Sequence, residues 1–472
     1  MRKTVRLPTP SARVLGAVAL TTLMCALAGG GARAAVRRAE AAPGAARAAI
    51  SASAPGDTVV LARGAHAGPL DVRIPLTLRG EPGAVVDGGG RGTVIVVAAT
   101  DVRLEDFEIR GSGRRVITID AGVHLLRCSG TRLRRMVVRD VLYGIYGERV
   151  KDALITGCRV TGRVAPLDES GEGNGIHLWY SSGIRIEGCA VERFLDAIYL
   201  SFTSDVVVED NRLQFCGRYG LHTMYCQENR LHGNLFARNV AGCAIMFSNH
   251  LQVSDNDFLH NRGPRTYGLL LRDCSNGTFE RNRLVDNTIA VFMDNSNRNR
   301  FRGNLLADNG WGLLLYSSCA ENKFWQNNFI HDDYPVALDM RTTDNAFDDG
   351  RAGNYWSDNA PYDLDADGVS DVPYAPVTAF AFLSKQFPDL AVLSKSPAVA
   401  ALGVAERVFP ALRPSEALDR FPSVRAVVAT GQAADHRRAA PERPRPAWAA
   451  AALFAGILGA GLAGAWRAAP WR

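Results

Sequence analysis

Basic segments interleaved with aromatic residues are missing from this 472-residue chain, and its net charge of +6 is spread over the whole length. We therefore expect no nucleic-acid partner, because proteins that bind nucleic acid concentrate positive charge on one face or segment. The chain also lacks the Leu-x-x-Leu-x-Leu frame, which excludes a leucine-rich repeat. The 47% content of hydrophobic residues nevertheless allows a sizeable buried core.

The N-terminus has the composition of a secretory signal peptide, which we place at residues 1–34. Basic residues at positions 2, 3, 6 and 13 precede an apolar stretch over 14–28, and Ala-Arg-Ala at 32–34 is a plausible cleavage site. The apolar stretch is too short to favour a membrane-spanning helix. Cys25 lacks a Leu three residues before it and a small residue directly before it, so we do not expect lipidation.

Removal of the signal peptide leaves eight cysteines in an oxidising compartment. Cys158 and Cys189 occupy equivalent repeat positions, about 4.8 Å apart if they lie on adjacent coils. Such a pair could form a disulfide. Two stacked, buried thiols are the interpretation that we favour.

An uncharged run over residues 447–466 follows a basic, Pro-rich linker that we place at 426–446. Twenty residues of helix span about 30 Å, which matches one bilayer core. The composition predicts a C-terminal transmembrane helix, although a disordered or surface-lying Ala/Gly-rich tail would have the same pattern.

Asparagine recurs at nearly constant intervals through the centre of the chain. One set has steps of 23, 22, 26, 22 and 23 residues and comprises Asn211, Asn234, Asn256, Asn282, Asn304 and Asn327. A second set lies five residues after four of these and comprises Asn239, Asn261, Asn287 and Asn309. A short β-rich run follows each unit. Units of 22 to 23 residues leave room for three short strands and three turns, and one such coil must stack on others to bury its apolar side.

The pattern predicts an all-β fold, a right-handed parallel β-helix of about a dozen coils over residues 50–350. The Asn columns would bond along the helix axis inside its bends. Earlier coils are less regular, and a Gly- and acid-rich insertion is expected at 162–173.

Strand alternation assigns the side chains of the repeated β-rich runs to two sides. The outward column includes His177, His222, Met224 and Met246. His222 and Met224 lie two residues apart on one strand, and Met246 is expected one coil above Met224. Imidazole and thioether form a soft ligand set that suits Cu(I), so these four residues are a candidate copper site. The alternative is an apolar stripe covered by a terminal segment or a partner.

A second candidate metal site lies after the repeats, in an Asp-rich segment that we expect to cap the β-helix over 351–376. Asp363, Asp365, Asp367 and Asp371 surround a Gly turn in the manner of a calcium loop. Tyr374 stands where a full loop has a bidentate Glu, so a solvated acidic turn is the alternative.

Several of these segments together resemble the NosD family. They are residues 218–225 (Arg-Tyr-Gly-Leu-His-Thr-Met-Tyr), 244–248 (Ala-Ile-Met-Phe-Ser), 268–273 (Gly-Leu-Leu-Leu-Arg-Asp), 353–358 (Gly-Asn-Tyr-Trp-Ser-Asp) and the Asp-rich segment 362–374. The last two carry most of the specificity, because other β-helices share the repeats. The resemblance covers roughly residues 50 to 420.

The resemblance implies a periplasmic, non-enzymatic accessory protein that helps to mature the copper–sulfur centre of nitrous oxide reductase. It implies three partners: the membrane subunit of an ABC-type transporter, a copper chaperone lipoprotein and the nitrous oxide reductase apoprotein. Amphipathic helices over 377–425 would dock on the transporter, with residues 400–409 as one such helix. The predicted C-terminal anchor departs from the family and would attach the protein to the inner membrane.

Two other functions fit a β-helix. A polysaccharide lyase, hydrolase or uronate epimerase would need an acid/base pair beside a sugar groove. The outward column offers only Arg272 and Asp294, with no carboxylates gathered on adjacent coils. A surface adhesin would account for the anchor but not for the His and Met residues.

Overall fold

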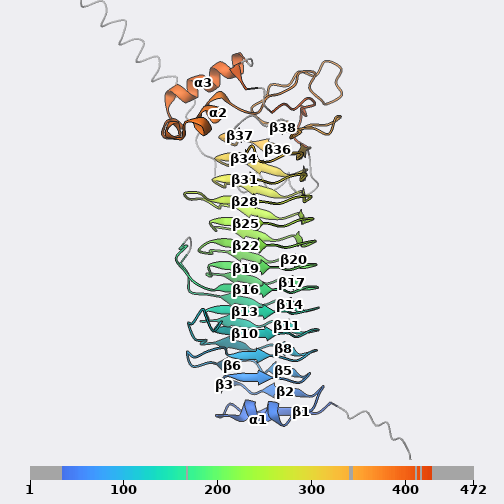
Figure 1. The fold of residues 1–472 in the computed structure, drawn as a ribbon, viewed down its shortest axis with the longest axis vertical. Helices are drawn as coiled ribbons and strands as arrows, with labels where there is room; N and C mark the ends of the chain where they lie inside the picture. Colours follow the sequence, from blue (N-terminus) through green and yellow to red (C-terminus); the bar gives the residue numbers. More distant parts are fainter. Residues whose placement is uncertain (1–33, 166–167, 340–343, 410–411, 415–416, 428–472) are drawn as a thin grey trace, which may run out of the picture.

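The computed structural model describes residues 34–427, except for 166–167, 340–343, 410–411 and 415–416. Three parallel sheets wind around one core, which confirms the predicted all-β, parallel β-helix (Figure 1). Two sheets have thirteen strands and one has twelve, close to the expected dozen coils.

The strands of each sheet stack in sequence order, and every third strand of the chain belongs to the same sheet except at β1–β2 and β36–β38. Sheet A contains β1 (Val36–Ala39), β2 (Thr58–Leu61), β5 (Thr77–Gly80), β8 (Arg103–Glu105), β11 (Arg132–Arg134), β14 (Leu154–Thr156), β17 (Arg185–Glu187), β20 (Val207–Glu209), β23 (Arg230–His232), β26 (Gln252–Ser254), β29 (Thr278–Glu280), β32 (Arg300–Arg302) and β35 (Lys323–Trp325). Sheet B contains β3 (Gly64–Ala67), β6 (Ala84–Asp87), β9 (Glu108–Arg110), β12 (Val137–Arg139), β15 (Arg159–Thr161), β18 (Ala190–Glu192), β21 (Arg212–Gln214), β24 (Leu235–Ala237), β27 (Asp257–Leu259), β30 (Arg283–Val285), β33 (Leu305–Ala307), β36 (Asn328–Ile330) and β38 (Tyr355–Trp356). Sheet C contains β4 (Leu70–Val72), β7 (Ile95–Val97), β10 (Ala121–Leu126), β13 (Tyr143–Glu148), β16 (Asn174–Trp179), β19 (Asp196–Ser201), β22 (Tyr219–Met224), β25 (Ala241–Met246), β28 (Tyr267–Arg272), β31 (Ile289–Asp294), β34 (Trp311–Leu315) and β37 (Tyr334–Leu338).

The core lies inside the coil and consists of stacked columns of like side chains. The central residues of the short strands face inward, and in sheet C alternate residues such as Ile176 and Leu178 are fully buried, as the alternation predicted. Aromatic rings stack along the axis in the same way, with 4.5 Å between the ring centroids of Phe279 and Phe301. Stacking of identical residues at the strand spacing is therefore the rule that organises this interior.

Both predicted Asn ladders are present inside the bends. The Nδ2 group of Asn256 donates to Oδ1 of Asn282 on the next coil (3.0 Å) and to the backbone carbonyl of Leu231 (3.0 Å). Its own Oδ1 accepts from both the backbone N–H and the Nδ2 group of Asn234, each at 2.9 Å. Each side chain thus satisfies buried backbone groups that the turn leaves without a partner.

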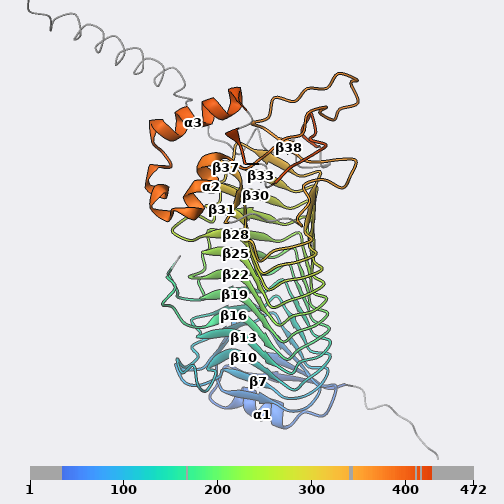
Figure 2. The ribbon, with the colours of Figure 1, turned by 45° about the horizontal axis from the view of Figure 1, so that its top comes forward.

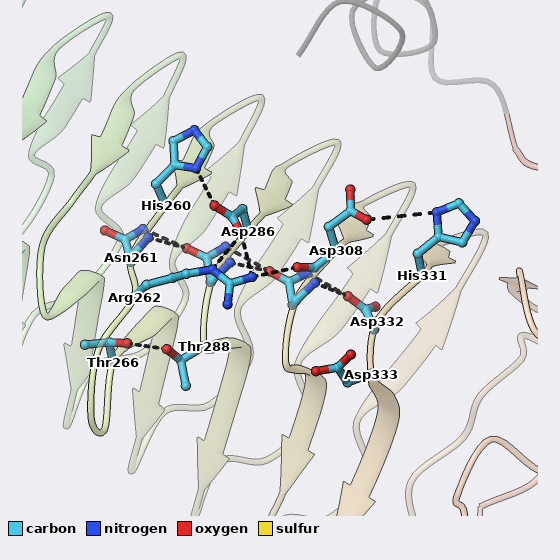
Figure 3. A network of polar contacts seen from close by, with 12 residues as sticks. His260, Asn261, Arg262, Thr266, Asp286, Thr288, Asp308, His331, Asp332 and Asp333 are labelled. Atoms are coloured by element: carbon cyan, nitrogen blue, oxygen red, sulfur yellow. Dashed lines mark hydrogen bonds and ion pairs between the residues drawn. The ribbon is translucent and has the colours of Figure 1, made fainter. Parts of the chain in front are cut away.

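Each of these two ladders ends on a carboxylate. Asp332 accepts two hydrogen bonds from Asn309 at the end of the second ladder (Figure 3). Asp419 accepts from the backbone N–H of Asn354 (2.7 Å) at the end of the first. Burial raises the pKa of Asp332 to about 8 and that of Asp419 to about 6.

Both ends of the β-helix are covered. Helix α1 (Ala45–Ser51) buries Ala46 and Ile50 in the core at the N-terminal end. Sheet A begins with β1, so the β-helix starts before the residue 50 expected from the sequence. At the other end, the chain returns at Ser423 and pairs with Tyr355 of β38. One side of this end carries three helices: α2 (Ala379–Gln386), the 3-10 helix η1 (Pro388–Leu393) and α3 (Pro397–Val408) (Figure 2).

A second apolar cluster lies on the outer face of sheet C. It runs up the last coils through Ala244, Leu270, Phe292 and Leu314 and ends against Ala381 of α2. The alternative of an apolar stripe covered by a terminal segment is therefore correct for this upper part of the outer face.

Three further expectations concern the termini and the cysteines. The predicted signal peptide and the predicted transmembrane run at 447–466 lie outside the described residues. Among the helices that the structure does describe, none is long and apolar enough to cross a membrane. All eight cysteines between residues 128 and 319 are buried free thiols, Cys158 and Cys189 included, so no disulfide joins this pair.

Candidate copper site on the outer face of sheet C

Rings alternate between His and Tyr up the outer face of sheet C. The column comprises His124, Tyr146, His177, Tyr199 and His222, one residue from each of the strands β10, β13, β16, β19 and β22. Neighbouring ring centroids are 4.5 to 5.3 Å apart. His222 is the last of these rings, because Ala244 follows it in register and the outer apolar cluster begins there.

His222 points to the outer side, as predicted, but it is only 6% exposed. Its ring stacks on Tyr199 at 4.5 Å and meets the edge of Tyr219 at 5.0 Å. Its inward-facing neighbours on β22, Leu221 and Thr223, are fully buried in the interior. The imidazole is therefore held rigidly at the surface of the sheet rather than extended into solvent.

Asp196 anchors this imidazole from the coil below. The guanidinium of Arg218 donates to both oxygens of the Asp196 carboxylate, at 2.7 and 3.0 Å. Oδ2 of Asp196 also lies 3.3 Å from Nδ1 of His222. Burial opposes ionisation of Asp196, but the hydrogen bonds from His222 and Arg218 outweigh it and lower the pKa of the carboxyl group.

An ionised carboxylate can only accept, so Nδ1 of His222 carries the proton that is shared with Asp196. In the neutral ring, Nε2 then presents a lone pair. This nitrogen is buried and has no hydrogen-bond partner among the described residues. A carboxylate on one ring nitrogen and a free lone pair on the other is the usual arrangement of a metal-binding histidine.

Two thioethers follow on the same face. Met224 and Met246 are in register on β22 and β25, so their backbones lie about 4.8 Å apart. The Tyr199 hydroxyl donates to Sδ of Met224 at 3.3 Å and orients that sulfur. Both methionine side chains are half-buried. One imidazole nitrogen and two thioether sulfurs can approach a common point from adjacent coils, which is the soft donor set predicted for Cu(I).

His177 does not belong to this group. Tyr199 lies between His177 and His222 in the column, so the two histidines are separated by two coils, about 9.6 Å. Burial also lowers the pKa of His177 to about 4, and its Nδ1 contacts the Asn174 amide at 3.2 Å. The structure therefore does not bring His177 together with the other three residues, because the column alternates between two ring types. Copper binding at His177 stays a prediction.

Residues 164 and 168 of the predicted insertion at 162–173 lie close to the start of β22. Gly217, just before β22, is so close to the insertion that a Cβ there would lie 2.2 Å from the Asp168 carbonyl oxygen and 2.8 Å from Val164. The insertion is seen in Figure 1 as the loop beside β16 to β22. The insertion thus packs against the start of β22.

Asp196, Arg218 and Tyr199 were not predicted from the sequence. A signal for the first was available, because Asp196 stands in the column where other coils have Asn174, Tyr219 and Ala241. A lone carboxylate in such a column, one coil from an outward histidine, indicates a hydrogen-bond partner for that ring.

The Asp-rich loop brings three of its four predicted residues together. One carboxylate oxygen from each of Asp363, Asp365 and Asp371 lies within 4.8 Å of the others, and Asp367 is not part of the group. Backbone amides of the loop already donate to them, for example Leu364 N–H to Asp371 at 2.7 Å. Calcium binding at this loop stays a prediction.

The fold and this outer face define a class, the parallel β-helix proteins that carry a polar and aromatic column on one sheet. Residues 151–361 match the family described as "Periplasmic copper-binding protein (NosD)". A "Probable ABC transporter binding protein NosD" from Pseudomonas aeruginosa is 30% identical over 380 residues, covering 77% of this chain and 87% of the relative. A protein of the same description from Stutzerimonas stutzeri is 27% identical over 378 residues, with coverages of 77% and 85%. The chain belongs to the NosD family.

Solved structures with the same architecture have other roles. The exopolygalacturonase of Yersinia enterocolitica is similar with a TM-score of 0.50 at 12% identity, covering 67% of this chain and 79% of that enzyme. PfbA, a surface adhesin of Streptococcus pneumoniae, has a TM-score of 0.50 at 11% identity, with coverages of 62% and 87%. At this identity the similarity concerns the fold alone.

Proposed function

We propose that this protein is a periplasmic accessory factor for the copper–sulfur centre of nitrous oxide reductase, and that it holds Cu(I) as cargo at His222, Met224 and Met246. The observation that supports the copper step is the buried Nε2 of His222, which has no partner among the described residues and belongs to the same face as Met224 and Met246, which are in register on adjacent strands. The family description as copper-binding supports the choice of metal.

The donor set suits transient holding of Cu(I). Thioethers and imidazole are neutral, soft ligands that favour Cu(I) over hard divalent ions. Asp196 and Arg218 keep the imidazole in one orientation, so binding need not order it. Met224 and Met246 are only half-buried, which leaves the ion accessible to the ligands of another protein.

The C-terminal helices form the proposed contact with the membrane subunit of an ABC-type transporter. The relatives are described as ABC transporter binding proteins. Large apolar side chains are exposed on these helices and their connections, namely Leu383, Phe387, Val392, Val404 and Phe409. Several large apolar side chains exposed within one segment are common at interaction surfaces. A copper chaperone lipoprotein as donor and the nitrous oxide reductase apoprotein as recipient complete the proposed set of partners.

The proposed role is non-enzymatic. On the outer face of sheet C, Arg272 and Asp294 pair with each other at 3.3 Å. Asp196 is fully buried against Arg218 and so is not available as a general acid or base. Release of unsaturated or reducing ends from uronate polymers by the purified protein would favour the polysaccharide enzyme instead.

Competition for Cu(I) with bathocuproine disulfonate tests the site. Replacing both Met224 and Met246 by leucine preserves volume, and we expect the affinity for Cu(I) to fall by at least about tenfold. Met293→Leu removes a thioether from the buried interior and is the matched control, with no expected change. Unchanged affinity in the double variant would refute this site.

A further inference from the structure

A groove of about 520 Å³ lies on the outer surface where the chain turns from sheet C into sheet A, in the last coils before the C-terminal cap. The residues that line it come from four successive coils and include Thr278, Arg298, Arg300, Glu321, Lys323 and Asp344. All five charged side chains among them are exposed. The volume is that of a site for a small molecule.

Two columns of side chains form the groove. The first residues of the sheet A strands form one column, in which Arg300 is in register with Thr278 below it and with Lys323 above it. The preceding turn residues form the other column, and Arg298 and Glu321 belong to it with φ of 56° and 58°. Successive residues of a column are one coil apart, about 4.8 Å.

The charges in this groove are arranged differently from those of the other coils. Elsewhere the turn residue beside a cation is acidic or neutral, as in the pairs Asp101 with Arg103 and Glu228 with Arg230. Between residues 101 and 323, Arg298 with Arg300 is the only coil in which both positions are cationic.

The next two coils reverse this sign. Glu321 stands beside Lys323, and Asp344 stands beside the neutral Ala346, which pairs with Lys323. The groove is therefore positive at the Arg298 coil and negative at the Asp344 coil.

These charges are not neutralised by one another. Nε of Arg298 donates to Oδ1 of Asn276 at 3.3 Å, and this neutral acceptor orients the guanidinium without cancelling its charge. Within the part of the chain that the structure describes, none of the five charged side chains of the groove forms an ion pair. By contrast, Arg185 in the same sheet A column pairs with Glu209 at 2.6 Å.

The arrangement does not help the fold. Arg300 and Lys323 are like charges directly opposite each other on paired strands, which is unfavourable. A ligand with a negative group at one end and a positive group at the other would neutralise both halves of the groove.

We infer that this groove binds a small zwitterion in which a phosphate group and a primary ammonium group are joined by a short linker, as in phosphoethanolamine. The phosphate lies on Arg298, Arg300 and Lys323, and the ammonium lies on Glu321 and Asp344. Planar guanidinium groups match phosphate oxygens in pairs, and a lysine adds a point charge. A primary ammonium has three N–H donors to share between two carboxylates. The two halves begin one coil apart, a step that a two-carbon linker spans.

Two sources share this chemistry, the headgroup of phosphatidylethanolamine in a membrane and a soluble phosphoethanolamine ester. The location favours the headgroup. Trp325 is in register with Arg302 at the end of sheet A, and aromatic rings beside cations are common at membrane interfaces. The inference does not depend on copper binding.

Calorimetric titration of the full chain with O-phosphoethanolamine and with inorganic phosphate tests the two halves of the groove separately. The arginine variant combines Arg298→Gln with Arg300→Gln, and the acid variant combines Glu321→Gln with Asp344→Asn. Arg230→Gln is the matched control, an exposed cation of the same sheet A column outside the groove. All of these side chains are exposed, so the fold should tolerate the substitutions.

We expect the unmodified protein to bind O-phosphoethanolamine at least about tenfold more tightly than inorganic phosphate. The arginine variant should lose at least about tenfold in affinity for both compounds. The acid variant should keep its affinity for inorganic phosphate and bind O-phosphoethanolamine no more tightly than phosphate. Arg230→Gln should bind both compounds as the unmodified protein does.

Co-sedimentation with phosphatidylcholine vesicles, with or without phosphatidylethanolamine, distinguishes the two sources. Binding that increases with phosphatidylethanolamine, and no longer does so in the arginine variant, assigns the lipid headgroup. Binding of O-phosphoethanolamine without this dependence assigns the soluble ester. The inference is overturned if the unmodified protein does not bind O-phosphoethanolamine, if it binds inorganic phosphate equally well, or if the arginine variant binds as the unmodified protein does.

Discussion

The substitution Asp332→Asn should make the protein more stable at neutral pH. Oδ1 of Asp332 accepts from the backbone N–H (2.9 Å) and from Nδ2 (2.8 Å) of Asn309, and an asparagine side chain keeps this acceptor. Oδ2 is buried without a partner among the described residues, although it lies at the end of the network in Figure 3. The substitution places a neutral amide where the native protein has a carboxyl group that resists ionisation.

The magnitude follows from the raised pKa of Asp332, about 8 against an ordinary value of 3.8. Because the folded-state pKa is the higher one, the stability conferred by the protonated carboxyl group is complete below about pH 4 and is lost as the pH rises through 8. Each pH unit in that window lowers the free energy of unfolding by at most about 1.4 kcal/mol. Between pH 5 and pH 8 we expect the native protein to lose about 2 to 4 kcal/mol of its free energy of unfolding through Asp332, and the Asp332→Asn variant to avoid this loss. The lower figure allows for partial solvation of the carboxyl group.

Guanidinium denaturation of both proteins at pH 5, 6, 7 and 8, followed by tryptophan fluorescence, measures this difference. The native midpoint should fall with pH more steeply than that of the variant, and the two curves should diverge most at pH 8. Asp419 contributes a fall between about pH 4 and 6 in both proteins and cancels in the comparison. Asp333→Asn is the control, because that carboxylate is exposed and pairs with Lys395 at 2.7 Å. Parallel curves for the native protein and Asp332→Asn would refute the reasoning.

Asn256→Ala should lower the free energy of unfolding by about 3 kcal/mol or more, because it removes the acceptor of the buried Asn234 backbone N–H and a donor to the Leu231 carbonyl oxygen. Equilibrium denaturation measures the loss, and a loss below about 1 kcal/mol would contradict the ladder's role. Asp419→Ala removes the acceptor of the Trp356 indole N–H (2.8 Å), so limited proteolysis should cut residues 357–425 sooner than in the native protein while the coils stay intact. Phe387→Ser with Val392→Ser should weaken binding to the transporter membrane subunit without lowering the melting temperature, since both side chains are exposed; equal binding in a pull-down with purified subunit would exclude this surface.

The repeats made much of the fold predictable, because stacking converts spacing in sequence into position in space. The Asn columns and the inward and outward sides of sheet C were all predicted from their spacing. A third column, which includes Asn229, Asn299 and Asn322, was not predicted because Leu251 and Gly277 interrupt it.

The candidate site was only partly predictable. Orientation follows from alternation, so His222, Met224 and Met246 were placed on the correct face. Burial of His222 depends on rings from other coils and on Asp196, which a single strand cannot reveal. The start of the β-helix was missed for a similar reason, because Val36–Ala39 forms a strand only by pairing with β2.

The covered ends of the β-helix have a consequence for the solubility of the protein. In-register parallel stacking with asparagine columns is also the architecture of amyloid fibrils, and any bare end of it would recruit another chain. Here α1 packs on the core at the first end, and at the other end the last coil is paired by Ala346 in sheet A, Ser423 in sheet B and Val377 in sheet C. If a protease removes either of these covering segments, we expect the bare strand edges to pair with another chain. The covering segments, and not the coils, therefore limit the growth of the stack.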